Sequence, residues 1–186
     1  MNYLLKACCL CISFLFISCG SQKNGETKRV NTFFDSNYKK SRKSFKGDLS
    51  GQEYDVLKTK IEKELGVKIP LGKSILVHYR QFGANCFLKG KGRKFKSNVS
   101  NNGINFSTKI SAAYNTEDFF IYSDNAINKD HYENLPEFQL DPGFFKELIF
   151  TLEENCAAFF VVKPNGKFLK YYGEDYNTEI ENFLKN

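Results

Sequence analysis

The sequence predicts an α/β protein with a mixed central sheet and helices on both of its faces. Helical and strand-like segments alternate along most of the chain, which indicates strands joined by helical crossovers. The chain then ends in two strand-like runs joined by a turn and followed by a helix, which adds an antiparallel edge. The 186 residues suit one domain with a shorter segment before it, and 19 Phe and 10 Tyr supply large apolar side chains for a core.

The first 18 residues have the composition of a targeting segment. Lys6 supplies positive charge, and the apolar run Ala7–Ser18 is too short to cross a bilayer about 30 Å thick at about 1.5 Å per residue. The segment Phe16–Gly20 (FISCG) resembles the lipobox of bacterial lipoproteins. The resemblance implies that residues 1–18 are a signal peptide and that Cys19 becomes the acylated, palmitate-bearing first residue. The alternative is an ordinary secretory leader that is cut elsewhere.

Residues 19–49 are predicted to be a flexible basic tether, because they are polar and show neither helical nor strand periodicity. The basic stretch Lys39–Lys43 could contact anionic headgroups or could simply be solvated. The expected location is the bacterial cell envelope, with the protein anchored by lipid to a membrane and facing the periplasm. Which of the two membranes holds the anchor is left open.

The folded domain is expected to span residues 50–186 and to begin with a helix. Ser50 and Glu53 have the spacing of a capping box, a helical stripe of apolar residues follows, and Gly66 ends the helix. The next clear element is a short apolar run at residues 74–79, which is typical of a buried strand.

The middle of the domain is less regular in sequence. Residues 86–117 are basic and rich in Asn and Gly, and no element is assigned to them. A second buried strand is predicted at 119–122. Asp141 then has the position of an N-cap, with Pro142 at the first position of a predicted helix. The apolar face expected for that helix consists of Phe144, Phe145, Leu148, Ile149 and Leu152.

The C-terminal part has the pattern of a hairpin and a helix. Residues 157–162 and 167–172 are strand-like, and the turn between them has the sequence Pro-Asn-Gly. A final helix is predicted to follow Asp175, with Tyr176 and Ile180 on its apolar side.

The hairpin FFVVKPNGKFLKYYG at residues 159–173 and the run KSILVHY at 73–79 resemble the corresponding parts of thioredoxin-like and redoxin lipoproteins. The resemblance covers about residues 50–186 and implies a three-layer α/β/α sandwich with a mixed central sheet. It requires residues 75–79 and 119–122 to be adjacent parallel strands and the two strands of the final hairpin to pair antiparallel.

Two features on which the chemistry of that family depends are missing. The loop after the first strand contains Cys86 alone, with no second cysteine three residues away on either side. The place of the family's cis-proline is taken by Asn155 and Cys156. The sequence therefore argues against an ordinary thiol–disulfide oxidoreductase.

In the fold implied by the resemblance, Cys86 and Cys156 lie on neighbouring loops. A disulfide between them would close a loop of about 70 residues and stabilise the fold by about 4 kcal/mol on a chain-entropy basis. The alternatives are two unpaired buried thiols, or a reactive Cys86 whose thiolate is stabilised by nearby basic residues.

The densest charge in the domain is the basic run at residues 89–96, which could bind an anionic lipid, a polysaccharide or an acidic partner, or could be a solvated loop. Its members are Lys89, Lys91, Arg93, Lys94 and Lys96. His78 and His131 are the only histidines, and no carboxylate pair, serine motif or zinc-ligand spacing accompanies them. We expect His78 and Arg80 to lie on the same side of their strand. No metal, cofactor or nucleic acid is expected.

These observations predict a non-catalytic envelope lipoprotein that uses a degenerate thioredoxin-like domain for interaction or as a scaffold. Its partners would be the membrane, through the anchor, and another envelope protein. The alternative is a thiol-dependent redox enzyme, of oxidoreductase or peroxidase type, acting through Cys86 with or without Cys156. A ligand-binding lipoprotein that uses the groove near Cys86 is a third possibility. The sequence assigns no catalytic residue and no oligomeric state.

Overall fold

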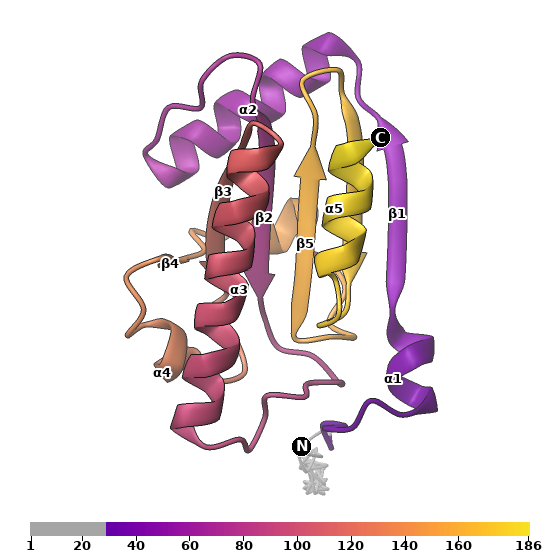
Figure 1. Cartoon of the computed structure of the whole chain (residues 1–186), viewed down its shortest axis with the longest axis vertical. Coiled ribbons are helices and arrows are strands. Elements are labelled where there is room, and N and C mark those ends of the chain that lie inside the picture. The colour runs from indigo at the N-terminus through magenta and orange to yellow at the C-terminus, as the bar shows by residue number, and fades with distance from the viewer. Residues whose placement is uncertain (1–28) are drawn as a thin grey trace, which may run out of the picture.

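The computed structural model describes residues 29–186, which fold around one six-stranded sheet (Figure 1). The predicted signal peptide, Cys19 and the first part of the tether lie outside the described residues. The strands are β1 (Lys43–Asp48), β2 (Ser74–Arg80), β3 (Thr116–Tyr122), β4 (Phe138–Leu140), β5 (Ala157–Val162) and β6 (Lys167–Tyr172). The helical elements are α1 (Ser36–Ser41), α2 (Gly51–Leu65), α3 (Arg93–Ala113), α4 (Lys129–Tyr132), the π-helical turn η1 (Phe145–Ile149) and α5 (Asn177–Lys185).

The sheet has the strand order β1-β6-β5-β2-β3-β4 and contains both parallel and antiparallel pairs. The predicted parallel pairing is confirmed: β2 lies beside β3, with Val77 opposite Phe119. The predicted hairpin is also confirmed, because β5 and β6 pair antiparallel, with Phe160 opposite Lys170. β2 pairs antiparallel with β5 on its other side, which places β2 near the centre of the sheet.

Helices cover both faces of this sheet, as the α/β class predicts. On one face, Ile61 of α2 and Phe145 of η1 belong to the same apolar cluster as Tyr79 of β2. On the other face, which is turned toward the viewer in Figure 1, Ile180 of α5 packs in a cluster with Leu76 of β2. The predicted capping box of α2 is present, and Gly66 ends that helix with φ of 66°. Within residues 29–186, no helix is both long enough and apolar enough to cross a bilayer.

The structure corrects the predicted boundary between tether and domain. Residues 36–41 form α1, and residues 43–48 form β1, which pairs with β6 along its whole length. Asp35 caps α1, because its carboxylate accepts hydrogen bonds from the N–H groups of Asn37 and Tyr38. β1 is an edge strand whose side chains are mostly exposed, so it carries no hydrophobic alternation that sequence analysis could detect.

The unassigned stretch 86–117 contains the longest helix of the described residues, α3. Its buried face consists largely of Ser100, Ser107 and Ser111, together with Ile110. These positions have helical spacing, but serine does not register in a hydrophobic pattern. The small side chains let the helix lie close to the sheet, where the Ser107 hydroxyl donates to Asp118 of β3. The Ser100 hydroxyl lies 3.0 Å from His131 Nε2 of α4.

The helix predicted after Asp141 is only the short π-helical turn η1. Asp141 has the predicted capping role, since its carboxylate accepts hydrogen bonds from the N–H groups of Gly143, Phe145 and Lys146. The prediction that Leu148 is buried is wrong, because Leu148 is 63% exposed. The wider turn of a π-helix rotates successive side chains differently from the assumed α-helical face.

Candidate functional site

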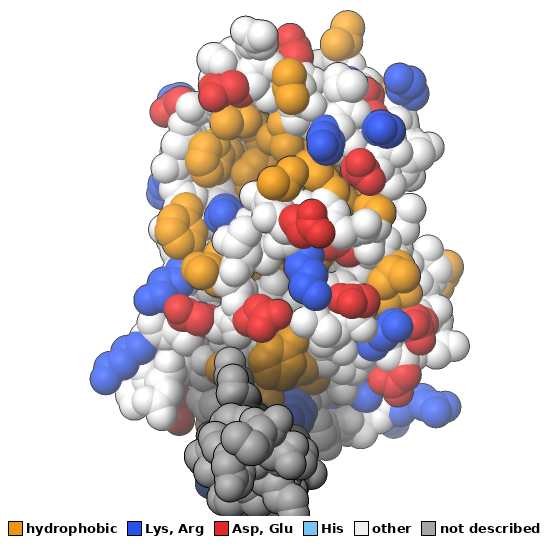
Figure 2. Space-filling view, turned by 180° about the vertical axis from the view of Figure 1, so that it is seen from behind, with side chains coloured by type: hydrophobic (Ala, Val, Ile, Leu, Met, Phe, Trp, Pro, Cys, Tyr) orange, Lys and Arg blue, Asp and Glu red, His pale blue; other side chains and the backbone are white. Residues whose placement is uncertain are grey.

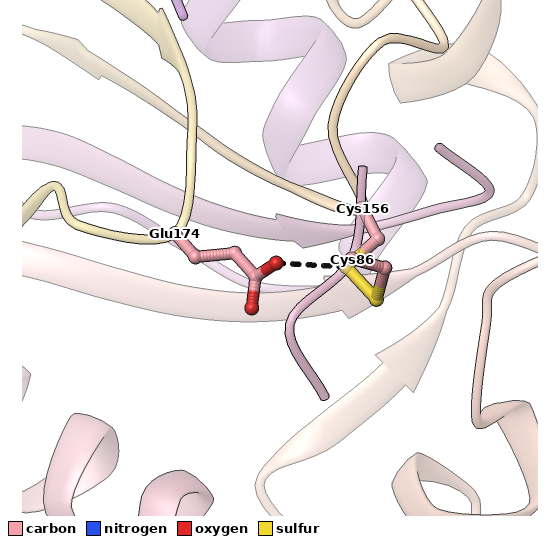
Figure 3. Close-up of side chains that lie close together, drawn as sticks. All are labelled: Cys86, Cys156 and Glu174. Atoms are coloured by element: carbon pink, nitrogen blue, oxygen red, sulfur yellow. Dashed lines mark hydrogen bonds between the residues drawn. A yellow bond between two sulfur atoms is a disulfide. The ribbon is translucent and has the colours of Figure 1, made fainter. Parts of the chain in front are cut away.

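Cys86 and Cys156 are joined by a disulfide at one end of the sheet (Figure 3). Cys86 lies in the loop between β2 and α3, and Cys156 directly precedes β5. Their Cα atoms are 5.2 Å apart, which confirms the prediction that the pair lies within bonding reach. Cys86 is 1% exposed and Cys156 is 4% exposed, so solvent reaches almost no part of the disulfide.

The backbone around the disulfide is held by its own hydrogen bonds. The Cys86 N–H donates to the Asn31 carbonyl at 2.7 Å, and the Cys156 N–H donates to the Asn85 carbonyl at 3.0 Å. Three chain segments, around Asn31, Asn85 and Asn155, therefore lie side by side in parallel bridges. The disulfide connects segments that are already hydrogen-bonded to one another.

Gly83 allows the loop to approach the segment before β5 this closely. A Cβ atom at position 83 would collide with the backbone of Asn155 and Cys156. Those neighbours are backbone atoms and cannot rotate away as the end of a flexible side chain could. A glycine is therefore required at position 83 on steric grounds.

Glu174 is the third polar group of the site and was not identified from the sequence. It follows β6, and its Oε1 atom lies 3.5 Å from Sγ of Cys156 (Figure 3). The Phe87 N–H donates a hydrogen bond to the same oxygen at 2.5 Å. Burial raises the pKa of the Glu174 carboxyl, while the Phe87 N–H and the charge of Arg80 act in the opposite direction. No sequence motif marks Glu174, because its neighbours in the site come from distant parts of the chain.

Apolar side chains enclose the two sulfurs. Cys86, Leu88 and Cys156 form a small buried cluster, against which Val30, Phe87 and Ile127 pack. Thiol–disulfide exchange requires a thiolate to approach a sulfur directly. In this arrangement the loop that carries Cys86 would have to move before any second protein could reach the bond.

The structure divides the basic run between a loop and the first turn of α3. The Lys91 ammonium lies over the ring of Phe87, 4.8 Å from its centroid. Arg93 and Lys96 line a cavity of about 350 Å³ together with His131 and Asp130. None of the five basic residues forms an ion pair with another described residue. Lys89 and Lys94 are exposed and do not line the cavity.

His78 belongs to a buried hydrogen-bond chain between the sheet and its helices. The Ser107 hydroxyl donates to Asp118 at 2.6 Å, and its oxygen lies 2.7 Å from His78 Nε2. His78 Nδ1 lies 3.1 Å from the Tyr176 hydroxyl, which also accepts a hydrogen bond from Arg80. The shared contact with Tyr176 confirms that His78 and Arg80 are on the same side of β2.

This chain does not have the order of a catalytic triad. In a triad the histidine lies between the carboxylate and the nucleophile, whereas here Ser107 lies between Asp118 and His78. Burial, with a smaller effect of the Arg80 charge, lowers the pKa of His78 to about 3, so its ring is neutral at pH 7. His131 is similarly bonded, with Nε2 3.0 Å from the Ser100 hydroxyl. His78 therefore connects β2 to α3, and His131 connects α4 to α3.

Comparisons with protein families, with curated proteins and with solved structures found no match for this chain. A functional assignment therefore depends on the residues and on the geometry described above.

Proposed function

We propose that this protein is a lipid-anchored lipoprotein of the bacterial cell envelope, whose domain is a non-catalytic interaction or scaffold module of thioredoxin-like architecture. The observation that carries the proposal is the burial of the Cys86–Cys156 disulfide. An enzyme that exchanges disulfides must present at least one sulfur to its substrate, and here both residues are almost completely covered.

The connections of the sheet support the thioredoxin-like part of the proposal. β2 and β3 are parallel, α3 lies between them in the chain, and β5 and β6 form an antiparallel hairpin followed by α5. The parallel pair and the final hairpin are the features that the sequence resemblance implies, whereas α3 lies in the stretch to which the sequence assigned no element. β1 and β4 extend the sheet at its two edges.

A structural role of the disulfide is supported by its position in the chain and in the fold. It joins residues that are 70 positions apart, and such a closure stabilises a fold by roughly 4 kcal/mol. It also fixes the loop between β2 and α3, whose backbone hydrogen bonds go mainly to Asn31 and to the segment before β5. Both properties are those of a covalent brace in an exported domain.

An apolar groove between α2 and η1 supports the interaction role (Figure 2). Its volume is about 470 Å³, and Leu57, Phe144 and Ile149 line it. Val56 and Leu148 on its walls are 61% and 63% exposed, so together with the lining residues they form a contiguous apolar surface, the kind that marks an interaction site. The groove provides a surface on which an apolar segment of another protein could be buried.

The position of the groove favours a protein over the lipid bilayer as its occupant. The described chain begins at Arg29, at the lower end of the molecule, whereas α2 crosses the upper end (Figure 1). Figure 2, seen from behind, shows the apolar surface at the same upper end of the molecule. We therefore propose that the groove takes an apolar segment of another envelope protein.

One observation favours the alternative, a thiol-dependent redox enzyme. The Glu174 carboxyl contacts Sγ of Cys156 and has a raised pKa, so it could exchange a proton with a thiol once the bond is reduced. Insulin reduction by the wild-type protein in the presence of a dithiol distinguishes the two functions. The proposed function predicts no reduction above the dithiol background, and a rapid reaction that Cys86→Ser abolishes would establish the enzyme.

A further inference from the structure

Cys86, Cys156 and Glu174 place two sulfur atoms and a carboxylate oxygen within 4.8 Å of one another (Figure 3). We propose that reduction of the disulfide converts this cluster into a binding site for one zinc-type divalent cation. The disulfide and the metal are then mutually exclusive states of the same three residues. This inference goes beyond the interaction role, which concerns the oxidised protein.

The geometry of the cluster fits a tetrahedral ion. With Zn–S bonds of about 2.3 Å and Zn–O bonds of about 2.0 Å, a sulfur and an oxygen bound to the same zinc lie about 3.5 Å apart. Cys156 Sγ and Glu174 Oε1 are separated by 3.5 Å. Two sulfurs on one zinc lie about 3.8 Å apart by the same construction. Side-chain rotation of the reduced cysteines can provide that separation while their Cα atoms stay 5.2 Å apart.

The carboxylate is oriented by groups that do not belong to the cluster. The Phe87 N–H donates to Oε1, and the Glu174 N–H donates to the Tyr38 hydroxyl. Hydrogen bonds of this outer type fix the direction of a metal ligand and strengthen binding. The apolar neighbours Leu88 and Ile127 lower the local dielectric constant, which strengthens the attraction between a cation and its anionic ligands.

The charges of the site also favour a bound cation. Two thiolates, one carboxylate and a divalent ion sum to one negative charge, which the nearby guanidinium of Arg80 can offset. Arg80 lies within Coulombic range of the Glu174 carboxyl, and its buried Nε has no hydrogen-bond partner within the described part of the chain.

The chemistry of loading is a two-electron exchange followed by ligation. A dithiol reductant attacks the Cys86–Cys156 bond, is itself oxidised to a disulfide, and leaves two protonated cysteine thiols. The divalent cation then displaces both thiol protons and binds the two sulfurs and the Glu174 carboxylate, with a water molecule as the fourth ligand. When a disulfide oxidant takes two electrons from the two thiolates, it is itself reduced to a dithiol, the Cys86–Cys156 bond re-forms and the ion is released because its thiolate ligands are lost.

Co²⁺ is a suitable probe, because thiolate ligation gives it an intense charge-transfer absorption. Full-length protein in detergent is reduced with a phosphine, freed of the reductant without oxygen, and titrated with Co²⁺ and then with Zn²⁺ as a competitor. We expect the reduced protein to bind one Co²⁺ with that absorption, Zn²⁺ to displace it, and the oxidised protein to show neither signal. Equal absorption from oxidised and reduced protein would overturn the proposal.

Glu174→Gln and Glu154→Gln are the matched variants. Both remove one carboxylate near the cysteines and leave the disulfide intact, but only Glu174 belongs to the cluster. We expect Glu174→Gln to weaken Co²⁺ binding at least tenfold and Glu154→Gln to leave it unchanged. Equal binding by these two variants would exclude Glu174 as a ligand and refute the three-residue site.

The double variant Cys86→Ser/Cys156→Ser retains every other cysteine of the chain, so its absorption measures ligation elsewhere. We expect it to lose the signal, and retention of the wild-type signal would contradict the proposal. Saturating Zn²⁺ should also slow reoxidation of the pair by diamide at least tenfold in wild type but not in Glu174→Gln. These results do not depend on insulin reduction, so the metal site and the interaction role can fail independently.

Discussion

The side chain of Asn155 is fully buried and makes hydrogen bonds in both directions with Ser41, 114 positions earlier in the chain. Asn155 Nδ2 donates to the Ser41 carbonyl at 2.8 Å, and the Ser41 hydroxyl donates to Asn155 Oδ1 at 3.0 Å. This pair attaches the end of α1 to the segment that carries Cys156. The segment before α2 is therefore part of the domain and braces the disulfide loop.

We expect Asn155→Ala to lower the free energy of unfolding by about 1–3 kcal/mol, because it removes two buried hydrogen bonds, including the one that the Ser41 carbonyl accepts from Asn155 Nδ2. Urea denaturation followed by circular dichroism measures the change. Asn101→Ala is the control, since Asn101 is exposed on α3, and its effect should stay within about 0.5 kcal/mol. Similar effects of the two substitutions would show that α1 is not fixed to the disulfide loop.

Cys86→Ser should destabilise the oxidised protein by about 2–4 kcal/mol, because it removes a crosslink between residues 70 positions apart. The same denaturation experiment in the presence of a strong reductant should show a much smaller difference between variant and wild type. Gel-shift alkylation of unreduced, native wild type should leave both mature-domain cysteines unmodified. Rapid modification of either one would contradict the structural role of the bond.

Protonation of His78 should destabilise the protein at acid pH. The pKa of His78 in the folded protein is about 3, below the unperturbed value of about 6.5, so the folded state binds this proton less readily than the unfolded state. The stability that neutral His78 contributes is complete above pH 6.5 and declines as the pH falls from there toward 3, with a limiting slope of about 1.4 kcal/mol per pH unit.

Urea denaturation at pH 7.5, 5.5 and 4.5 of wild type and His78→Gln checks this effect. The variant should be less stable at pH 7.5, because it disturbs the contacts with Ser107 and Tyr176. Its stability should nevertheless fall less steeply than that of wild type over the same range. Equal slopes would mean that His78 is not responsible for the acid sensitivity.

A photo-crosslinking residue at Val56 should give one discrete adduct in intact cells if the groove between α2 and η1 holds a protein partner. The same residue at Asn101, exposed on α3, should give none. Leu148→Asp should suppress the Val56 adduct while changing the free energy of unfolding by less than about 1 kcal/mol, because Leu148 is mostly exposed. An adduct that persists in Leu148→Asp would place the partner outside the groove.

Cys19→Ala should move the protein from the detergent-dependent membrane fraction to the soluble fraction, because the acyl chains provide the anchor. Cys11→Ala, within the predicted signal peptide, is the control and should stay in the membrane fraction. A mature wild-type protein that begins elsewhere than residue 19, together with a membrane-bound Cys19→Ala variant, would refute the lipobox assignment.

Local sequence signals predicted the elements that depend on local physics. The capping box of Ser50 and Glu53, the stop at Gly66 and the Pro-Asn-Gly turn each specify backbone geometry through atoms only a few residues apart. Buried strands in the centre of the sheet were also recognisable, because both of their faces are apolar.

A helix whose buried face is polar, or a strand whose side chains are exposed, has no apolar pattern by which the sequence could reveal it. α3 escaped recognition because Ser100, Ser107 and Ser111 occupy its buried side. The sequence of β1 reads as a tether, because an edge strand obtains its order from backbone hydrogen bonds to β6 and needs no apolar alternation.

The sequence by itself determined the α/β class, the central strands and the final hairpin, whereas the proximity of Cys86 to Cys156 was only implied by a family resemblance and was established by the structure. Only the tertiary structure brought Glu174 to Cys156 and Asn155 to Ser41, and only it formed the groove beside Val56. Elements follow from interactions between near neighbours in the chain. Contacts across 18 or 114 positions depend instead on how the sheet and its loops pack, and no local pattern encodes that packing.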